Sequence, residues 1–218
     1  MDPELKACMG RVLELAQRPS LESTPESEPS CIRTPPSPEA IKRRQRETAE
    51  RAGVPRRFLD VDPELIDEAL WNQCFDGEHN SLFLHGPPGT GKTHLAVALL
   101  KDAGKMEYDT FITVASLLME LRDSFRKDSE RSEANIIRQY SKASLVVLDD
   151  LGAEKTSEFA LKSLYIIIDK RYSEMRPTII TSNLSVDEIA EKTGDRIASR
   201  IAGMCNVIKL KGKDRRIS

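Results

Sequence analysis

The chain has 218 residues, 39% of them hydrophobic, a length that suits one globular domain with an extension. Its 33 Lys and Arg nearly balance its 35 Asp and Glu, so any contact with nucleic acid requires a local basic patch rather than overall charge. No apolar run approaches the roughly 20 residues of a membrane span, and the acidic start lacks the basic region of a signal peptide. We therefore expect a cytoplasmic protein.

The four cysteines are far apart in the sequence and form no C-x-x-C pair. The three histidines, His79, His85 and His94, do not lie at the spacing of zinc ligands. Neither a zinc site nor a disulfide framework is expected from this pattern.

The first 37 residues divide into two segments of different composition. Residues 1–17 predict an amphipathic helix, because their apolar side chains recur at helical spacing. These side chains are Leu5, Met9, Val12, Leu13 and Ala16. Residues 18–37 are rich in Pro, Ser and Glu and predict a flexible linker. The helix either docks on another protein or folds back on the core, and we favour docking.

Two helical patterns follow the linker. Residues 38–57 are rich in Lys and Arg and predict a basic helix that ends near Gly53. Such a run is usually a solvated face, and we interpret it so in the absence of a known partner. A further helical pattern covers residues 62–75, ahead of the first strand.

Residues 86–93 match the P-loop pattern G-x-x-x-x-G-K-[ST]. They are Gly86, Pro87, Pro88, Gly89, Thr90, Gly91, Lys92 and Thr93. An apolar run precedes the loop and a helical pattern follows it, which favours a nucleotide site over an ordinary loop between strand and helix. The glycines allow backbone N–H groups to face phosphate oxygens, Lys92 can reach the β- and γ-phosphates, and Thr93 can bind Mg²⁺. The expected cofactors are ATP and Mg²⁺.

Four more short runs rich in β-branched residues follow, at 111–114, 145–148, 178–181 and 206–208, with helical patterns between them. This alternation predicts an α/β fold with a five-stranded, mainly parallel sheet covered by helices on both faces. In such sheets ligands bind at the carboxyl ends of the strands.

Polar residues stand at two of these strand ends. Asp149 and Asp150 follow the 145–148 run as a Walker B element, in which Asp149 would hold Mg²⁺ and Asp150 would orient the attacking water. Asn183 follows the 178–181 run and could bind the γ-phosphate or the water. The alternative is a helix N-cap at Asn183 or Ser185.

Four stretches together resemble the DnaC/DnaI/IstB group of AAA+ ATPases: 86–95, 148–154, 181–184 and 195–201. The resemblance covers about residues 51–218 and implies an AAA+ αβα core, here assigned to 38–218, without a C-terminal helical lid. It places His94 with the nucleotide-binding residues and makes Asn183 sensor 1. Arg200 becomes the arginine finger that reaches a neighbouring subunit's nucleotide, with Arg196 as its companion.

Two departures from the family pattern concern residues of the nucleotide site. Arg216 falls where the family has a sensor 2 arginine, but Asp214-Arg215-Arg216 replaces the usual Ser-Tyr-Arg. The second Walker B acid is Asp150, shorter than the Glu of most AAA+ proteins, which implies slow hydrolysis.

Residues 115–127 resemble the family's extra helix that touches single-stranded DNA. Arg122, Arg126 and Lys127 could neutralise phosphates, and Phe125 could stack on a base. The alternative is an amphipathic helix in which Phe125 belongs to the core, together with the leucines of the same stretch.

The resemblance implies an ATP-dependent loader of the replicative helicase, acting as an AAA+ homo-oligomer on single-stranded DNA with nucleotide at its subunit interfaces. The helix at 1–17 would then dock on the helicase. Two alternatives are an IstB-like ATPase that assists transposition and a nucleotide-gated adaptor with little hydrolysis.

Overall fold

A single five-stranded sheet lies at the centre of the computed structural model, which describes residues 37–74, 77–103, 108–126, 128–129, 131–153, 158–212 and 214. Its strand order is β2-β3-β4-β1-β5, and every neighbouring pair is parallel. The strands are β1 (Ser81–His85), β2 (Thr110–Thr113), β3 (Val146–Leu151), β4 (Thr178–Ser182) and β5 (Cys205–Lys209). The predicted parallel sheet is thus confirmed, whereas the predicted helix at 1–17 and nearly all of the linker lie outside the described residues.

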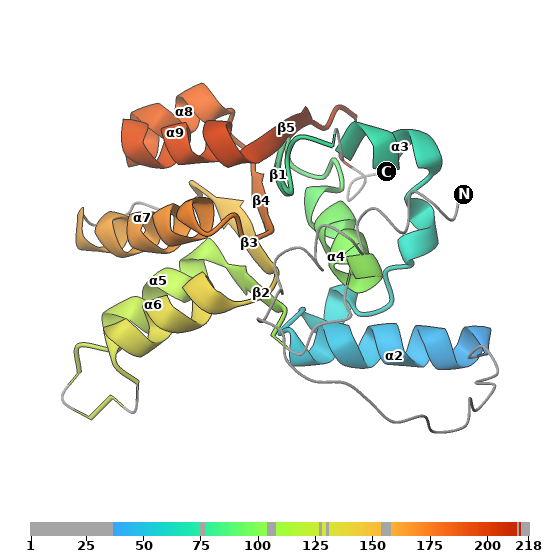
Figure 1. Ribbon diagram of the computed structural model, residues 1–218, viewed down its shortest axis with the longest axis horizontal. Coiled ribbons are helices and arrows are strands. Elements are labelled where there is room, and N and C mark those ends of the chain that lie inside the picture. The colour runs from blue at the N-terminus through green and yellow to red at the C-terminus, as the bar shows by residue number, and fades with distance from the viewer. Residues whose placement is uncertain are drawn as a thin grey trace, which may run out of the picture.

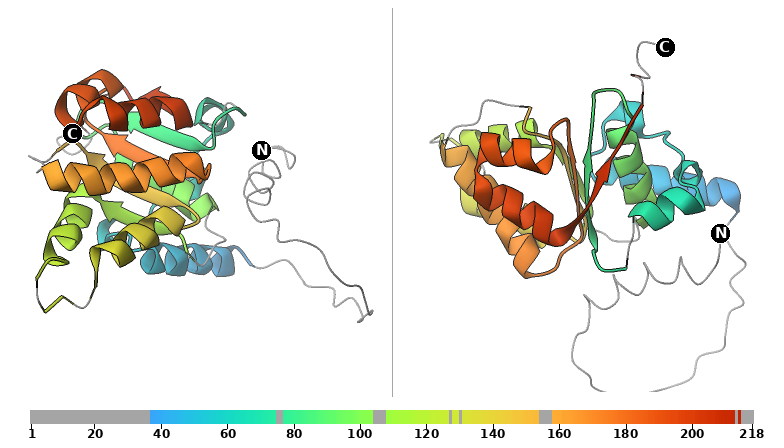
Figure 2. Two further views of the ribbon diagram at one scale, coloured as in Figure 1. Left: turned by 60° about the vertical axis from the view of Figure 1, so that its left-hand side comes forward. Right: turned by 90° about the horizontal axis from the view of Figure 1, so that it is seen from above.

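Helices cover both faces of the sheet (Figure 1 and the right-hand view of Figure 2). One face carries α2 (Pro38–Arg51), α3 (Glu68–Cys74) and α4 (Lys92–Ala103), with the short 3-10 helices η1 (Arg56–Phe58) and η2 (Pro63–Leu65). The other face carries α5 (Val114–Asp123), α6 (Glu133–Lys142), α7 (Glu158–Ser173), α8 (Val186–Thr193) and α9 (Asp195–Met204). Among the described residues, no helix has the length and apolarity needed to cross a membrane.

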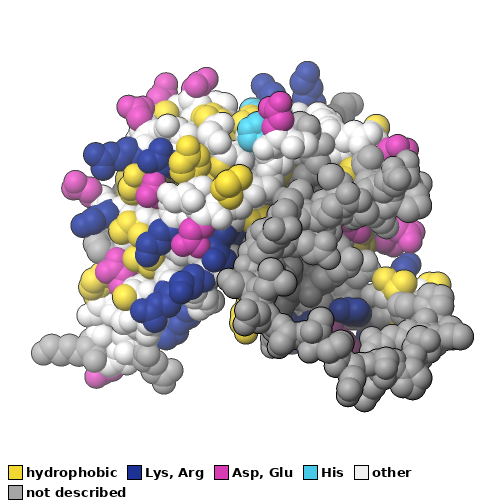
Figure 3. Space-filling model, viewed as in Figure 1, with side chains coloured by type: hydrophobic (Ala, Val, Ile, Leu, Met, Phe, Trp, Pro, Cys, Tyr) yellow, Lys and Arg dark blue, Asp and Glu magenta, His cyan; other side chains and the backbone are white. Residues whose placement is uncertain are grey.

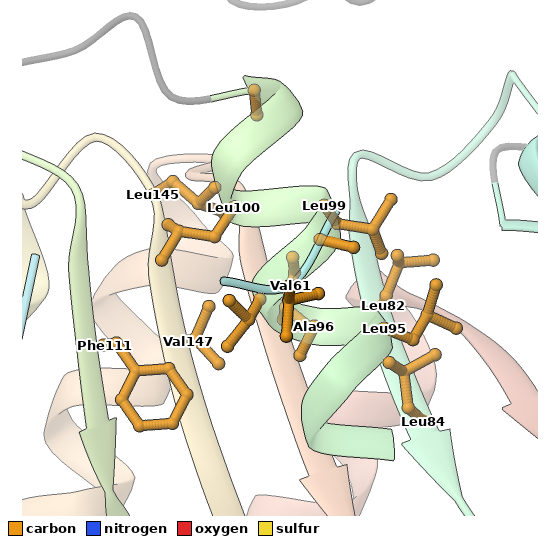
Figure 4. Packing of buried hydrophobic residues seen from close by; sticks show 14 of the residues in the cluster. Val61, Leu82, Leu84, Leu95, Ala96, Leu99, Leu100, Phe111, Leu145 and Val147 are labelled. Atoms are coloured by element: carbon orange, nitrogen blue, oxygen red, sulfur yellow. The ribbon is translucent and has the colours of Figure 1, made fainter. Parts of the chain in front are cut away.

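The strands supply both layers of core because successive side chains point to opposite faces. On β1, Leu82 and Leu84 join the α4 side, and Phe83 joins the other side. Figure 4 shows Leu95, Ala96, Leu99 and Leu100 of α4 beside residues from β1 and β3. Burying each such leucine stabilises the fold by roughly 1.5–3 kcal/mol, so α4 is firmly held behind the loop that precedes it.

The helical pattern at 62–75 is two separate elements rather than one helix, which corrects the prediction. Ile66 is extended at ψ 97 and buried in the core, so the chain breaks there between η2 and α3. The Asp67 side chain then accepts a 2.7 Å hydrogen bond from the N–H of Leu70. The buried Ile66 side chain thus ends η2, and the Asp67 cap at the next residue starts α3.

The basic helix is present as α2 and ends at Arg51, ahead of Gly53 as predicted. Several of its cations are paired within the chain: Lys42 with Asp62 at 3.5 Å, and Arg43 with Glu47 at 3.7 Å. These acids offset part of the positive charge, which agrees with our interpretation of the run as a solvated face.

Two buried cations fix the scaffold by binding backbone carbonyls. On α4, Lys101 donates from Nζ to Leu59 O at 2.9 Å and to Val61 O at 2.6 Å. On α7, the fully buried Arg171 donates from Nη1 to the carbonyl oxygens of Tyr140 and Ala143, both at 2.8 Å. Burial lowers the pKa of Arg171 to about 9. These contacts satisfy carbonyls of loops and of the end of α6 that would otherwise be costly to bury.

Candidate nucleotide site

The predicted P-loop connects β1 to α4, with the phosphate-facing end of the loop at the N-terminus of that helix. Gly86, Gly89 and Gly91 all have positive φ, at 140°, 75° and 94°. At Gly86 a Cβ would also lie 2.2 Å from Leu210 O, so only glycine fits there. Backbone N–H groups and the positive end of a helix dipole thus meet at this loop, the arrangement that binds an anion. The Asp214 carboxylate lies against the loop, with its Oδ1 1.8 Å from where a Cβ at Gly89 would be.

Lys92 lies folded under this loop. Its Nζ donates to Gly86 O at 2.7 Å and to Pro87 O at 2.8 Å, and the residue is only 8% exposed. Thr90 closes the loop by donating from Oγ1 to Pro87 O at 2.9 Å. The Lys92 ammonium group is therefore held at the P-loop. With a nucleotide bound there, phosphate oxygens would replace the two carbonyls as its partners.

Thr93 and Asp149 bring two hard oxygen ligands together. Thr93 Oγ1 donates to Asp149 Oδ1 at 2.9 Å, although the residues are 56 apart in the sequence. Asp149 is 8% exposed, and burial raises the pKa of its carboxyl group. A buried carboxylate beside a hydroxyl suits Mg²⁺, which takes few protein ligands and completes its shell with water and phosphate oxygens. The residues present therefore fit both Mg²⁺ and a nucleoside triphosphate.

A β-bulge orients the two Walker B acids. Leu148 pairs with Ile180 and Leu151 pairs with Ser182, so Asp149 and Asp150 together face the single residue Thr181. Asp150 has a φ of 61°, a conformation rare for a residue with a side chain. Bulges re-aim side chains, and here the extra residue allows two consecutive acids to serve one site.

Thr181 is the residue of this site that sequence reasoning missed. Its Oγ1 donates to Asp149 Oδ1 at 2.7 Å and accepts from the backbone N–H of Asp150 at 2.9 Å, and it is 1% exposed. One hydroxyl thus connects the Asp149 carboxylate to the Asp150 backbone. The signal was a threonine at the end of the strand that carries Asn183, but its partners depend on which strands are neighbours.

Asn183 extends the same cluster. Its Nδ2 donates to Asp150 Oδ1 at 3.2 Å. The helix cap is Ser185, which forms a capping box with Glu188 at the start of α8. Of the two cap positions considered, the structure therefore uses Ser185, and the Asn183 amide faces the second acid instead.

Arg200 and Arg196 contact α7. Arg200 Nε donates to Asp169 Oδ1 at 2.7 Å, and its guanidinium lies 4.8 Å from the centre of the Tyr172 ring. The hydrogen bond that Arg200 donates to Asp169 raises the pKa of Arg200. The Arg196 guanidinium lies 6.0 Å from the Tyr165 ring. In the described part of the chain, no hydrogen bond joins either arginine to the P-loop cluster.

The remaining predicted residues fall into two groups. His94 is exposed on the first turn of α4, and its ring meets Phe58 edge-on at 4.9 Å. Arg216 and Lys127 lie outside the described residues, as does Glu154, the next acid after the Walker B pair.

The stretch predicted to touch single-stranded DNA forms α5 and the turn after it. The helix ends at Asp123, so Phe125 and Arg126 lie in the turn rather than on the helix. Leu117 and Leu121 are buried, whereas Phe125 is 57% exposed and is not part of the core. Figure 3 shows Lys and Arg side chains on the side of the molecule formed by α5, α6 and α7.

Comparison with known proteins identifies the family. A model of the IstB-like ATP binding protein family matches residues 57–218. Over 130 residues the chain is 34% identical to the replicative helicase loader DnaC of Escherichia coli strain K12, covering 58% of this chain and 52% of that protein. Over 163 residues it is 35% identical to the insertion sequence IS5376 putative ATP-binding protein of Geobacillus stearothermophilus, covering 72% and 63%.

A solved structure gives the same relation. The crystal structure of the DnaC helicase loader matches with a TM-score of 0.61 and 26% identity, covering 72% of this chain and all of that one. The chain spans about half the length of the DnaC relative, 52%, and 63% of the insertion-sequence relative. With its AAA+ fold and its match from residue 57 onward, the chain belongs to the IstB-like ATP binding protein family, which is related to the DnaC and DnaI helicase loaders.

Proposed function

We propose that this protein is an ATP-dependent loader of a replicative helicase, which hydrolyses ATP slowly as an AAA+ oligomer on single-stranded DNA. The observation that carries the ATPase part is the contact between Thr93 and Asp149, with Asp150 and Asn183 beside it. The loader part is supported by the similarity to DnaC.

The nucleotide would be held mainly by backbone groups. The P-loop N–H groups bind the phosphates, and Lys92 exchanges its two loop carbonyls for phosphate oxygens. Thr93 and Asp149 would hold Mg²⁺, which when bound neutralises charge on the β- and γ-phosphates. These groups already lie together at one end of the sheet, so binding would exchange the partners of Lys92 and Thr93 without moving the elements that carry them.

Hydrolysis would depend on Asp150 and Asn183. Asp150 would accept a proton from, or orient, the attacking water, and the Asn183 amide would hold the Asp150 carboxylate through its hydrogen bond to Oδ1. The shorter reach of an aspartate compared with a glutamate makes slow turnover the expected outcome. Arg200, with Arg196, would act on the nucleotide of a neighbouring subunit, so hydrolysis requires assembly.

DNA and helicase would bind elsewhere on the chain. Arg122 and Phe125 are exposed at the end of α5, where a cation and an aromatic ring suit a phosphate and a base. Arg126 is paired with Asp123 at 3.8 Å, a weak exposed contact that a phosphate can replace. The segment 1–17 remains our proposed docking element for the helicase.

Two measurements on the purified protein test the proposal. The first is ATP hydrolysis with and without single-stranded DNA, and the second is retention of the protein on the immobilised replicative helicase. A loader should show both activities, and deletion of residues 1–37 should leave ATP binding intact while abolishing retention.

A peptide covering residues 1–20 should bind the helicase by itself. If instead the truncated protein binds as tightly as the full chain, residues 42–57 become the better candidate for the docking element.

A role as a helper of transposition is the second candidate, favoured by the family model and by the insertion-sequence relative. It predicts assembly on duplex DNA with ATP and no retention on the helicase. A nucleotide-gated adaptor, the third possibility, would bind ATP and a partner with no measurable turnover.

A further inference from the structure

Helices α7 and α9 lie side by side on one face of the sheet (Figures 1 and 2). Three residues of α7 face three residues of α9, and both sets have the spacing i, i+4, i+7 that places side chains on one helix face. On α7 these are Tyr165, Asp169 and Tyr172, and on α9 they are Arg196, Arg200 and Gly203.

The centre of this contact is the Asp169 carboxylate. Its Oδ1 accepts from Arg200 Nε at 2.7 Å and from the Tyr165 hydroxyl at 3.3 Å. Tyr172 supplies a ring to one side of the same guanidinium, at 4.8 Å. The Arg200 side chain therefore has both a hydrogen-bonded edge and an aromatic surface that restrict its rotation.

Gly203 allows the Tyr172 ring to lie where it does. A Cβ at this position would be 3.2 Å from Cε2 of Tyr172, tighter than ordinary contact. Gly203 is helical and has no positive φ. A side chain at this position would therefore disturb the close approach of the Tyr172 ring and not the backbone conformation.

We propose that Asp169 is a positioning residue, which holds Arg200 so that its terminal nitrogens face the nucleotide of a neighbouring subunit. The proposal rests on the proposed function, because it takes Arg200 as the arginine finger. The Asp169 bond uses Nε rather than the terminal nitrogens Nη1 and Nη2, and arginine binds phosphate oxygens through two parallel hydrogen bonds from its planar guanidinium.

Stability alone does not explain this arrangement. Both side chains of the pair are 33% exposed, and exposed ion pairs contribute little to folding. A fixed direction matters more for catalysis, because a misplacement of about 1 Å can reduce a rate by roughly 10²-fold. A free arginine would also lose the entropy of several rotatable bonds each time it reached a neighbour.

The test separates the two roles of a subunit in mixed oligomers. Asp150→Asn subunits cannot hydrolyse their own nucleotide but can donate a finger, and Arg200→Ala subunits can hydrolyse but cannot donate. Their mixture should recover ATPase activity. Adding Asp169→Ala to the Asp150→Asn subunit should lower the recovered activity by at least about tenfold, the scale expected for a displaced group.

The reverse mixture is the control for a structural defect, because an Asp169→Ala subunit with a damaged fold would hydrolyse its own nucleotide poorly. Subunits with Asp169→Ala alone, mixed with Asp150→Asn subunits that donate an intact finger, should hydrolyse ATP normally at those interfaces. Glu191→Ala, which removes an exposed acid from α8, should change neither mixture. Asp169→Asn keeps the side-chain shape and one acceptor oxygen, so it provides the second variant if the alanine variant does not fold, and it should give intermediate donor activity.

The outcomes distinguish the two claims. No recovery in the first mixture would overturn the finger role of Arg200 and thus the proposed trans mechanism. Recovery that is the same with Asp169 and with Ala or Asn in the donor would overturn the positioning role while leaving the finger intact. An equal loss in donor and acceptor mixtures would also overturn it, since Asp169 would then act on the fold of its own subunit.

Discussion

The cluster of the P-loop and Walker B residues, here called the nucleotide cluster, and the contact between Arg200 and Asp169 differ in the interactions that hold their side chains in place. Lys92, Asp149 and Thr181 are between 1% and 8% exposed, and each is held by at least two hydrogen bonds to loop carbonyls, hydroxyls or backbone N–H groups. Arg200 and Asp169 are each 33% exposed and are fixed by one hydrogen bond beside an aromatic ring. Lys92, Asp149 and Thr181 thus find their partners within one chain, whereas the Arg200 pair presents a charged group at the surface. Substitutions of Lys92, Asp149 or Thr181 should therefore lower activity in every subunit that carries them. Substitutions of Arg200 or Asp169 should lower it only at the interfaces between subunits.

Lys92→Ala should have the largest effect, because it removes the cation from the buried loop. Loss of charged hydrogen bonds worth about 1.5–3 kcal/mol each predicts ATP binding weaker by roughly 100-fold or more. Titration with a fluorescent ATP analogue measures this, and Lys170→Ala, an exposed cation on α7, serves as the control. Affinity within a few-fold of the unaltered protein would contradict the assignment of the P-loop.

Asp150→Asn should preserve ATP binding and lower hydrolysis by about 100-fold, the usual size of a general-base contribution. Asparagine tolerates a left-handed conformation well, so the φ of 61° should not strain the variant. Steady-state phosphate release measures turnover. Unchanged turnover would transfer the role to Glu154.

Arg200→Ala should leave ATP binding by the isolated subunit unchanged and lower both hydrolysis and nucleotide-dependent assembly. We expect a loss of at least about tenfold, below the roughly 10³-fold that a finger can contribute, because Arg196 remains on the same helix face. Turnover measured against protein concentration checks this: the deficit should grow as the protein assembles. A deficit that is constant at every concentration would make the role structural.

Thr181→Val should lower turnover by about tenfold, because it removes the hydroxyl that connects the Asp149 carboxylate to the Asp150 backbone while it keeps the shape of the side chain. The backbone N–H of Asp150 would also lose its partner, a cost of roughly 1–3 kcal/mol for a buried donor. Thr181→Ser retains the hydroxyl and should keep most of the activity. If valine and serine reduce turnover equally, packing of the methyl group, and not the hydroxyl, is what matters.

Thr181 also illustrates what the sequence could and could not predict. The parallel sheet, the P-loop and the Walker B acids follow from local patterns, since periodicity and motif spacing are properties of short stretches. The bridge from Thr181 to Asp149 and Asp150 requires knowing that β3 and β4 are neighbours and that a bulge occurs between them. The break at Ile66 was missed for a similar reason, because the burial of that side chain in the core overrides a helical pattern.

The smallest predicted effect concerns the stability of the nucleotide-free protein. Burial raises the pKa of Asp149, so the folded state binds the proton more tightly than the unfolded state does. The stability that this protonation contributes is present below the unfolded pKa of 3.8 and is lost as the pH rises through the folded pKa. At neutral pH the charged carboxylate therefore costs stability. Asp149→Asn removes the charge, and its Oδ1 can still accept from Thr93 and Thr181.

Without nucleotide and Mg²⁺, Asp149→Asn should therefore melt at a higher temperature than the unaltered protein at about pH 7.5, by roughly 2–4 °C if the difference is about 1 kcal/mol. The advantage should shrink as the pH falls, because the folded unaltered protein then takes up the proton and loses the buried charge. Glu191→Gln, at an exposed position, should show no such trend. With saturating ATP and Mg²⁺ the order should reverse, since the unaltered protein binds the ligand more tightly and gains more stability from it. A variant that melts lower than the unaltered protein without ligand would mean that the Asp149 carboxylate stabilises the fold, and the nucleotide cluster would then be built for the fold as well as for ATP.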